Sequence, residues 1–101
     1  MEITSREDGG VTLVSLKGRL DTNTAPQLEE FANDLFANGK MNLVVDMAEC
    51  DFVSSAGLRV LLAAQQHMEA NGGEDVCVRN ANALILDTLE MTGFRGVINV
   101  Q

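Results

Sequence analysis

The sequence predicts an α/β domain with a largely parallel β-sheet and one antiparallel strand at its edge. Short β-branched and aliphatic runs alternate with single stretches of helical spacing, in the order ββαβαβαβ. Gly9-Gly10 between the first two runs suits a hairpin, which pairs its strands antiparallel. The 101 residues are enough for one modest core but not for two, so we expect one domain over residues 1–101.

Two short extended runs predict the N-terminal hairpin. Ile3–Thr4 is the first and Val11–Leu16 the second, with a turn around Asp8-Gly9-Gly10. Both faces of the second run carry apolar side chains, so we expect this strand inside the sheet. Gly18 is expected to loosen the chain after it.

The first helix is predicted to begin beside Pro26, which is tolerated in a first turn because its missing N–H has no partner there. Thr24 and Gln27 have the spacing of a capping box. Asn38-Gly39 is expected to end the helix. Its buried face follows the three-and-four spacing of an amphipathic helix: Leu28, Phe31, Ala32, Leu35 and Phe36.

The stretch Asp51–Leu58 joins a buried strand, Met41–Met47, to a second helix that ends at Asn71-Gly72-Gly73. Ser54 and Ser55 fall where the helix pattern begins. A serine there can cap free backbone N–H groups, and a phosphate there is stabilised by the same groups. The residues that recur at helical spacing in this helix are Leu58, Leu61, Leu62, Gln65 and Met68.

The C-terminal third predicts one more strand, a helix and a last extended piece. Asp75–Arg79 is the strand, and Asn80-Ala81-Asn82 is a loop and helix cap. The helix buries Ile85, Leu86 and Leu89 and is expected to end at Thr92-Gly93. Val97–Val100 is the final extended piece.

Charge and hydropathy exclude two classes of partner. The net charge of −8 disfavours nucleic acid, because binding to its phosphates needs clustered Lys and Arg. No apolar run approaches the roughly 18 residues of a membrane helix and the opening residues are no signal peptide, so we expect a cytoplasmic protein without membrane insertion. Cys50 and Cys77 lack the spacing of a zinc site and are expected to be reduced, partly buried thiols.

A serine at a strand-to-helix turn also raises the hypothesis of a hydrolase. The nucleophile-elbow glycines are absent, and the only histidine, His67, lies twelve residues after Ser55, about 18 Å along the helix. Lys17 and Lys40 sit in no recognisable motif. The acids at strand ends and in loops form no evident catalytic pair: Asp21, Asp46 and Asp51. We therefore expect no enzyme, but either a simple helix cap or a hydroxyl that receives a phosphate.

Four separated blocks, in order and spanning nearly the whole chain, carry a family resemblance. They are Gly18-Arg19-Leu20-Asp21, Leu43-Val44-Val45-Asp46, residues 52–62 (FVSSAGLRVLL) and residues 89–94 (LEMTGF). Together they resemble the STAS domain of bacterial anti-sigma factor antagonists. The resemblance implies a four- or five-stranded mixed β-sheet with helices packed mainly on one side.

The resemblance also implies partner switching without a cofactor in this chain. In that family the unmodified protein binds an anti-sigma factor that is a serine kinase, phosphorylation of one serine ends the binding, and a metal-dependent serine phosphatase restores it. Any nucleotide belongs to the kinase.

Aligned on Gly57-Leu58, the phosphorylation site falls on Ser55. The expected partner-binding residues are Asp21, Thr22, Asn23, Ser54, Ser55, Ala56, Gly57 and Leu58. The family motif commonly reads Asp-Ser-Ser/Thr-Gly-Leu, whereas this chain has Ser54 in place of the acid and Ala56 in place of the second hydroxyl. These departures keep an alternative open: a non-phosphorylated STAS scaffold or accessory subunit of a transport or signalling complex.

Overall fold

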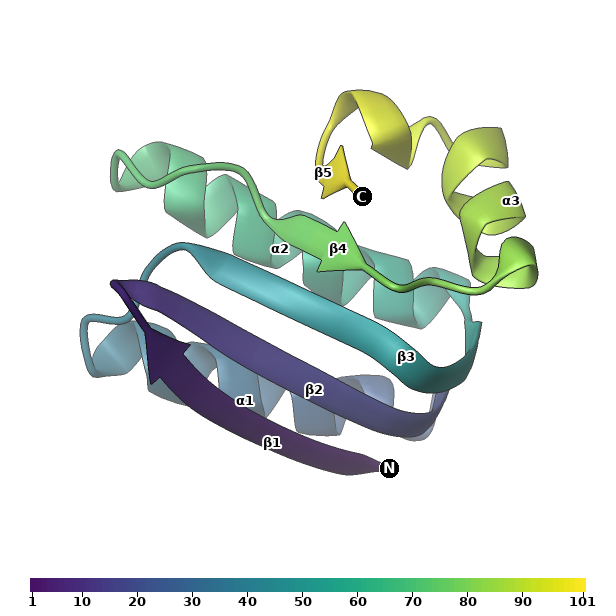
Figure 1. Ribbon diagram of the computed structural model, residues 1–101, viewed down its shortest axis with the longest axis horizontal. Helices are drawn as coiled ribbons and strands as arrows, with labels where there is room; N and C mark the ends of the chain where they lie inside the picture. Colours follow the sequence, from purple (N-terminus) through teal and green to yellow (C-terminus); the bar gives the residue numbers. More distant parts are fainter.

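The computed structural model describes all 101 residues and has the predicted order of strands and helices (Figure 1). A short 3-10 helix, η1, precedes the last strand. The elements are β1 (Glu2–Asp8), β2 (Val11–Leu20), α1 (Ala25–Ala37), β3 (Leu43–Val53), α2 (Ser55–Ala70), β4 (Cys77–Arg79), α3 (Ala83–Met91), η1 (Phe94–Gly96) and β5 (Asn99–Val100).

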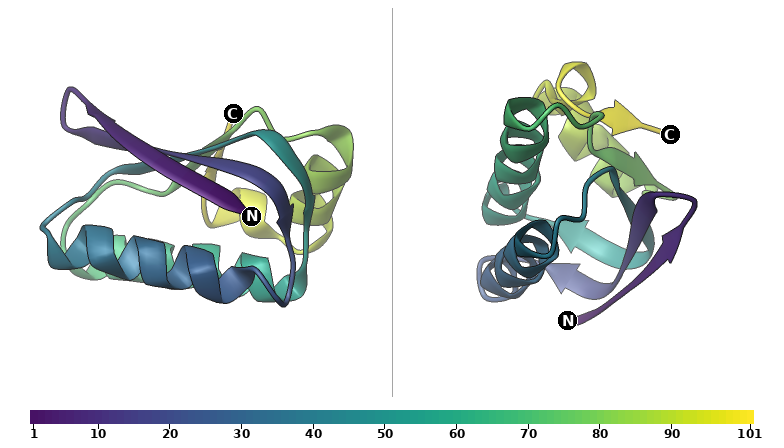
Figure 2. Two further views of the ribbon diagram at one scale, coloured as in Figure 1. Left: turned by 90° about the horizontal axis from the view of Figure 1, so that it is seen from below. Right: turned by 90° about the vertical axis from the view of Figure 1, so that its left-hand side faces the viewer.

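The five strands form one mixed sheet in the order β1-β2-β3-β4-β5. β1 is antiparallel to β2, and all other neighbours are parallel. α1 and α2 lie side by side on one face (Figure 2). Right-handed crossovers place successive helices on the same face when the strand order advances in one direction. The predicted α/β fold, with helices mainly on one side, is confirmed.

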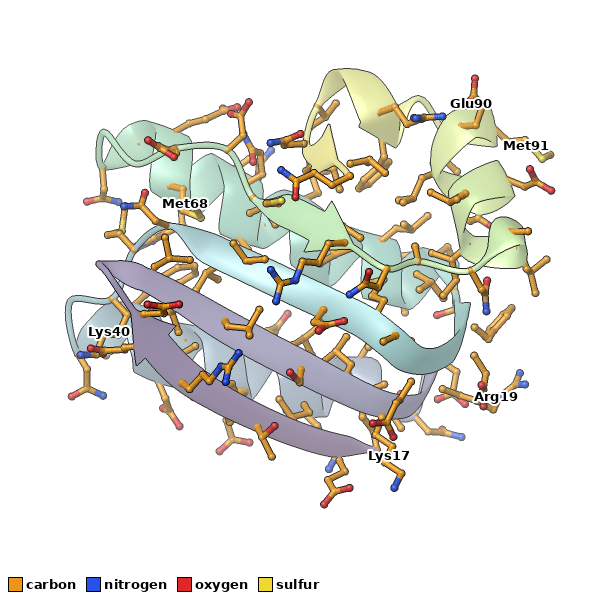
Figure 3. All side chains as sticks on the ribbon, in the orientation of Figure 1. Lys17, Arg19, Lys40, Met68, Glu90 and Met91 are labelled. Carbon is orange, nitrogen blue, oxygen red and sulfur yellow. The ribbon has the colours of Figure 1, made fainter.

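No helix covers the other face of the sheet, which carries charged side chains from the strands. Lys17 on β2 lies 3.7 Å from a carboxylate oxygen of Glu49 on β3 (Figure 3). Asp46, also on β3, accepts hydrogen bonds from the Ala48 N–H and from Nδ2 of Asn80. A sheet covered on one side only thus leaves charged residues such as Lys17 and Glu49 exposed on its central strands.

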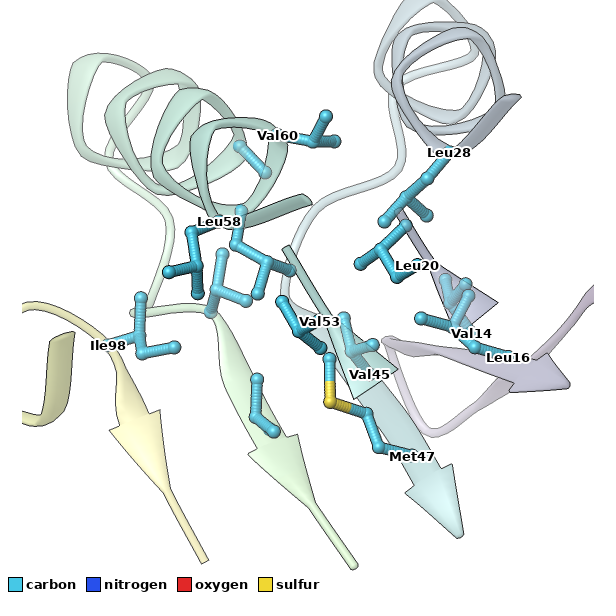
Figure 4. Close-up of a cluster of buried hydrophobic side chains, with 14 of the residues drawn as sticks. Val14, Leu16, Leu20, Leu28, Val45, Met47, Val53, Leu58, Val60 and Ile98 are labelled. Atoms are coloured by element: carbon cyan, nitrogen blue, oxygen red, sulfur yellow. The ribbon is translucent and has the colours of Figure 1, made fainter. Parts of the chain in front are cut away.

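A cluster of 20 buried residues fills the space between the sheet and the helices (Figure 4). Its one buried polar neighbour on α2 is Gln65, which is 1% exposed. Gln65 Oε1 accepts a hydrogen bond from the Val76 N–H at 2.7 Å, and its Nε2 donates to Asp75 and Glu69. Gln65 therefore pairs with the backbone N–H that leads into β4, and its amide is fully hydrogen-bonded although it is buried.

β2 and β3 are longer than predicted because irregular pairing extends them. β2 passes Gly18, which has a φ of +115° beside a register shift, and ends at Leu20. β3 runs beyond Met47 to Val53 through two register shifts against β2. An inserted residue bends a strand without ending it. The predicted end of the second strand at Leu16 is therefore wrong, since β2 continues to Leu20.

The observed bounds of β1 and β4 also differ from the predicted ones. β1 covers Glu2–Asp8 instead of Ile3–Thr4, since an exposed edge strand need not alternate apolar and polar residues. β4 is limited to Cys77–Arg79. The predicted helix ends are confirmed at Asn38 and Asn71, and Asn82 caps α3 by accepting a hydrogen bond from the Ile85 N–H at 2.8 Å.

Candidate functional site

The carboxyl ends of the parallel strands and the N-termini of the three helices meet at one edge of the molecule, on the right in Figure 1. The Ser54 N–H, after β3, donates a hydrogen bond to the carbonyl of Leu20, the last residue of β2, at 2.8 Å. Nδ2 of Asn82 donates to the Asp51 carbonyl at 3.2 Å. The loops after β2 and β3 are thereby joined into one surface, with the start of α3 beside it.

Ser54 and Ser55 have different roles at this edge. Ser54 has extended backbone, and its Oγ accepts a hydrogen bond from the Gly57 N–H at 3.3 Å, so Ser54 is the cap of α2. Ser55 is the first residue of α2 and is exposed. Its hydroxyl forms no hydrogen bond within the chain, so it is free to react or to contact another molecule.

Gly57 allows α2 to approach the end of β2 closely. A Cβ at this position would lie 2.6 Å from Cγ of Leu20 and 3.1 Å from its carbonyl oxygen. Gly57 and Leu58 are buried and Ala56 is half-buried, so these residues support the surface from below. Whether any of the three contacts a partner stays a prediction.

The loop after β2 is a turn organised by the side chain of Asp21. Its Oδ1 accepts hydrogen bonds from the N–H groups of Asn23, at 2.9 Å, and Thr24, at 3.1 Å. Thr22 and Asn23 are exposed beside it. The site thus contains the predicted Asp21–Asn23 segment and the two serines, held together by the bond between Leu20 and Ser54.

The predicted capping box of Thr24 and Gln27 is wrong. Thr24 does occupy the N-cap position of α1, but its side chain makes no cap hydrogen bond. Its hydroxyl donates to the Arg19 carbonyl at 2.6 Å and accepts from the Asp21 N–H at 2.8 Å. Because Oγ1 of Thr24 is engaged in the turn that precedes α1, it accepts no hydrogen bond from the first N–H groups of the helix. Pro26 lies in the first turn of α1, as predicted.

Hydrogen bonding lowers the pKa of Asp21. The N–H of Thr24 contributes most, and together with the Asn23 N–H, the Thr24 hydroxyl and the Arg19 charge it outweighs the opposing desolvation. Burial raises the pKa of Asp46, but hydrogen bonds from Ala48 and Asn80 and the charges of Arg79 and Arg6 reverse the shift and lower it. Both carboxylates are therefore ionised at neutral pH.

Acid should destabilise the protein partly through Asp21. A folded-state pKa below the ordinary 3.8 means that the stabilisation is present above that value and is lost as the pH falls through the folded pKa. Asp21→Asn keeps the acceptor oxygen but does not titrate. Urea unfolding should therefore show a smaller loss of unfolding free energy between pH 6 and pH 3 for the variant than for the wild type; equal losses would contradict this assignment.

Arg19 and Phe52 form a pair at the border of the site that sequence reasoning did not assign. The Arg19 guanidinium lies 4.6 Å from the centre of the Phe52 ring, and its Nε lies 3.9 Å from Asp21 Oδ2. Both residues belong to the four sequence blocks that carry the family resemblance, but only the parallel pairing of β2 with β3, which sets Arg19 opposite Phe52, brings them together.

The geometry offers no activated nucleophile. His67 lies in the last turn of α2, where its ring stacks on Phe36 with centroids 4.0 Å apart. Burial raises the pKa of both thiols, Cys50 and Cys77. No group of three His, Cys, Asp or Glu side chains is placed to hold a metal ion, and no helix is long and apolar enough to cross a membrane.

The comparisons identify the family. The family model described as "Mlab, STAS domain" matches residues 3–99. The chain belongs to the STAS domain family. This STAS domain is also 30% identical to BtrV of Bordetella bronchiseptica, which is named as an anti-sigma factor antagonist, over 99% of this chain and 85% of BtrV. It is therefore a member of the anti-sigma factor antagonist family.

Solved structures share the fold of this STAS domain. An anti-sigma factor antagonist from Mycobacterium paratuberculosis has a TM-score of 0.87 and 25% identity, covering 98% of this chain and 83% of that one. SpoIIAA in its unphosphorylated form has a TM-score of 0.76 and 15% identity, covering 99% and 87%. At that identity, SpoIIAA supports the fold alone.

Proposed function

We propose that this STAS domain is an anti-sigma factor antagonist controlled by phosphorylation of Ser55. In its unmodified form it binds and sequesters an anti-sigma factor that is a serine kinase, and it performs no chemistry of its own. One observation carries the proposal: Ser54 is used as the cap of α2, whereas the neighbouring Ser55 hydroxyl is exposed and unbonded. BtrV and the mycobacterial protein, both named as anti-sigma factor antagonists, support it.

The covalent step takes place on Ser55 Oγ. The oxygen attacks the γ-phosphorus of ATP held by the kinase, an O–P bond forms, the bond to the β-phosphate breaks, and ADP leaves while the hydroxyl proton passes to a base of the kinase. A metal-dependent serine phosphatase reverses the change, with water releasing inorganic phosphate. SpoIIAA, which shares the fold, has been solved in a phosphorylated form.

The proposed docking surface consists of the Asp21–Asn23 turn and the Ser54–Leu58 segment. Thr22, Asn23 and Ser55 are its exposed members, while Gly57 and Leu58 hold it in place from the core. A phosphate on Ser55 would add nearly two negative charges beside the ionised Asp21 turn. A partner packed on this surface would then face like-charge repulsion and the cost of burying the phosphate, so the complex would dissociate.

The proposal is tested by the affinity of this domain for serine-kinase anti-sigma factors from the same genome, measured by calorimetry. Ser55→Asp should bind about tenfold or more weakly, or roughly 1.4 kcal/mol. Ser55→Ala should bind like the wild type but accept no phosphate from ATP. Ser54→Ala is the matched control: it should lose about 1 kcal/mol of stability as a lost cap, yet still be phosphorylated on Ser55.

Unchanged affinity in Ser55→Asp, together with no phosphate on Ser55, would overturn the proposal. That result would favour the alternative, a non-phosphorylated scaffold of a transport or signalling complex. One observation supports the alternative: Ser54 and Ala56 replace residues of the usual motif. Recovery of membrane-transport subunits and no kinase in a pull-down would then support the scaffold.

A further inference from the structure

Arg59 is a cation without a partner in an acidic protein. The chain has 15 acidic residues against seven Lys and Arg, so most cations find a carboxylate. Five of the seven do: Lys17, Arg19, Lys40, Arg79 and Arg95. Arg6 on β1 and Arg59 on α2 form no ion pair and are both exposed.

Helical geometry places Arg59 next to Ser55. Both residues are exposed on α2, four positions apart, which makes their side chains neighbours on the helix surface with Cβ atoms about 5–6 Å apart. No carboxylate competes at three or four positions from Arg59. Those positions hold Ser55, Ala56, Leu62 and Ala63.

The order of the two residues also favours a pair. An anion placed four residues before a cation on a helix is the better of the two orientations. A phosphate on Ser55 would stand before Arg59 in this order, whereas the other cation near the site, Arg19, is already engaged by Asp21 and Phe52. Arg59 is thus the free cation best placed to meet a phosphate on Ser55.

We infer that Arg59 is a positioning residue that pairs with the phosphate on Ser55 and holds it along α2. This inference rests on the proposed function, since it requires Ser55 to be the modified residue. Phosphorylation would then change the docking surface at two points. An anion is added at Ser55, and the guanidinium of Arg59 is held by the phosphate and is no longer free to contact a partner.

The test uses the full chain with phosphoserine inserted at position 55 during translation, so that no kinase is needed. The second pKa of the phosphate, near 6, is followed by phosphorus NMR. At low salt it should be lower by about 0.3 in the otherwise wild-type chain than in Arg59→Gln. The difference should shrink at about 1 M salt, where charges are screened within roughly 3 Å.

Two control variants separate pairing from a general effect of charge. Arg6→Gln removes the other unpaired cation, from β1, and should leave the phosphate pKa unchanged; Arg59→Lys should retain part of the shift. Equal phosphate pKa values in the wild type and Arg59→Gln would overturn the inference. That result is independent of the proposed function, which is decided by partner binding and phosphorylation of the Ser55 variants.

Discussion

Replacing Leu20 with alanine is expected to lower the free energy of unfolding by about 2–5 kcal/mol, the range for deleting a fully buried leucine side chain. Leu20 is 0% exposed and lies at the end of β2, in the core cluster, against Gly57 of α2. The substitution leaves its carbonyl in place, so the hydrogen bond from the Ser54 N–H can persist. Urea unfolding of the two proteins gives the difference directly.

Leu84→Ala is the matched control for this prediction. Leu84 lies on α3 and is 57% exposed, so the same chemical change there should alter the stability by no more than about 0.5 kcal/mol. A loss of less than about 1 kcal/mol in Leu20→Ala would contradict the packing of β2 against α2. Faster hydrogen exchange at the Ser54 N–H in Leu20→Ala would show that packing of the Leu20 side chain stabilises the hydrogen bond between Ser54 and Leu20 at the candidate site.

Gly57→Ala is expected to destabilise the protein by about 2–3 kcal/mol, because the added methyl group overpacks a close contact. Its carbon would meet Leu20 Cγ at 2.6 Å, Cδ2 at 2.9 Å and the backbone oxygen at 3.1 Å. The side chain of Leu20 is buried and the oxygen belongs to β2, so neither can move away freely. The expected measurement is a lower midpoint in urea with an unchanged slope.

Gly96→Ala tests whether the effect comes from the contact or from losing a glycine. Gly96 lies in η1, and nothing lies within 4 Å of a Cβ built there, so this variant should match the wild type within about 0.5 kcal/mol. In the Leu20→Ala background the clash with Cγ and Cδ2 disappears, so Gly57→Ala should cost less there than alone. Additive losses in the double variant would refute the contact.

For the two serines, the sequence predicts the position in the site but not the role of each residue. Spacing identifies Ser54 and Ser55 as residues of a helix start, but it assigns neither role. The structure assigns the cap to Ser54, because an extended φ and ψ before α2 direct its Oγ at the Gly57 N–H. The spacing of Thr24 and Gln27 does not produce a capping box, because the Thr24 hydroxyl donates to the Arg19 carbonyl, outside the motif.

The sequence by itself determined the order of strands and helices, the sheet class, most helix ends and the family. The order, the sheet class and the helix ends depend on periodicity and on Gly, Asn and Pro, which act over a few residues, whereas the family rests on the resemblance of four sequence blocks. Only the tertiary structure decided the length of β2 and β3, the burial of Gln65, the contact of Gly57 with Leu20 and the pairing of Arg19 with Phe52. Each of these joins residues far apart in the chain, where pairing register and packing decide the contact.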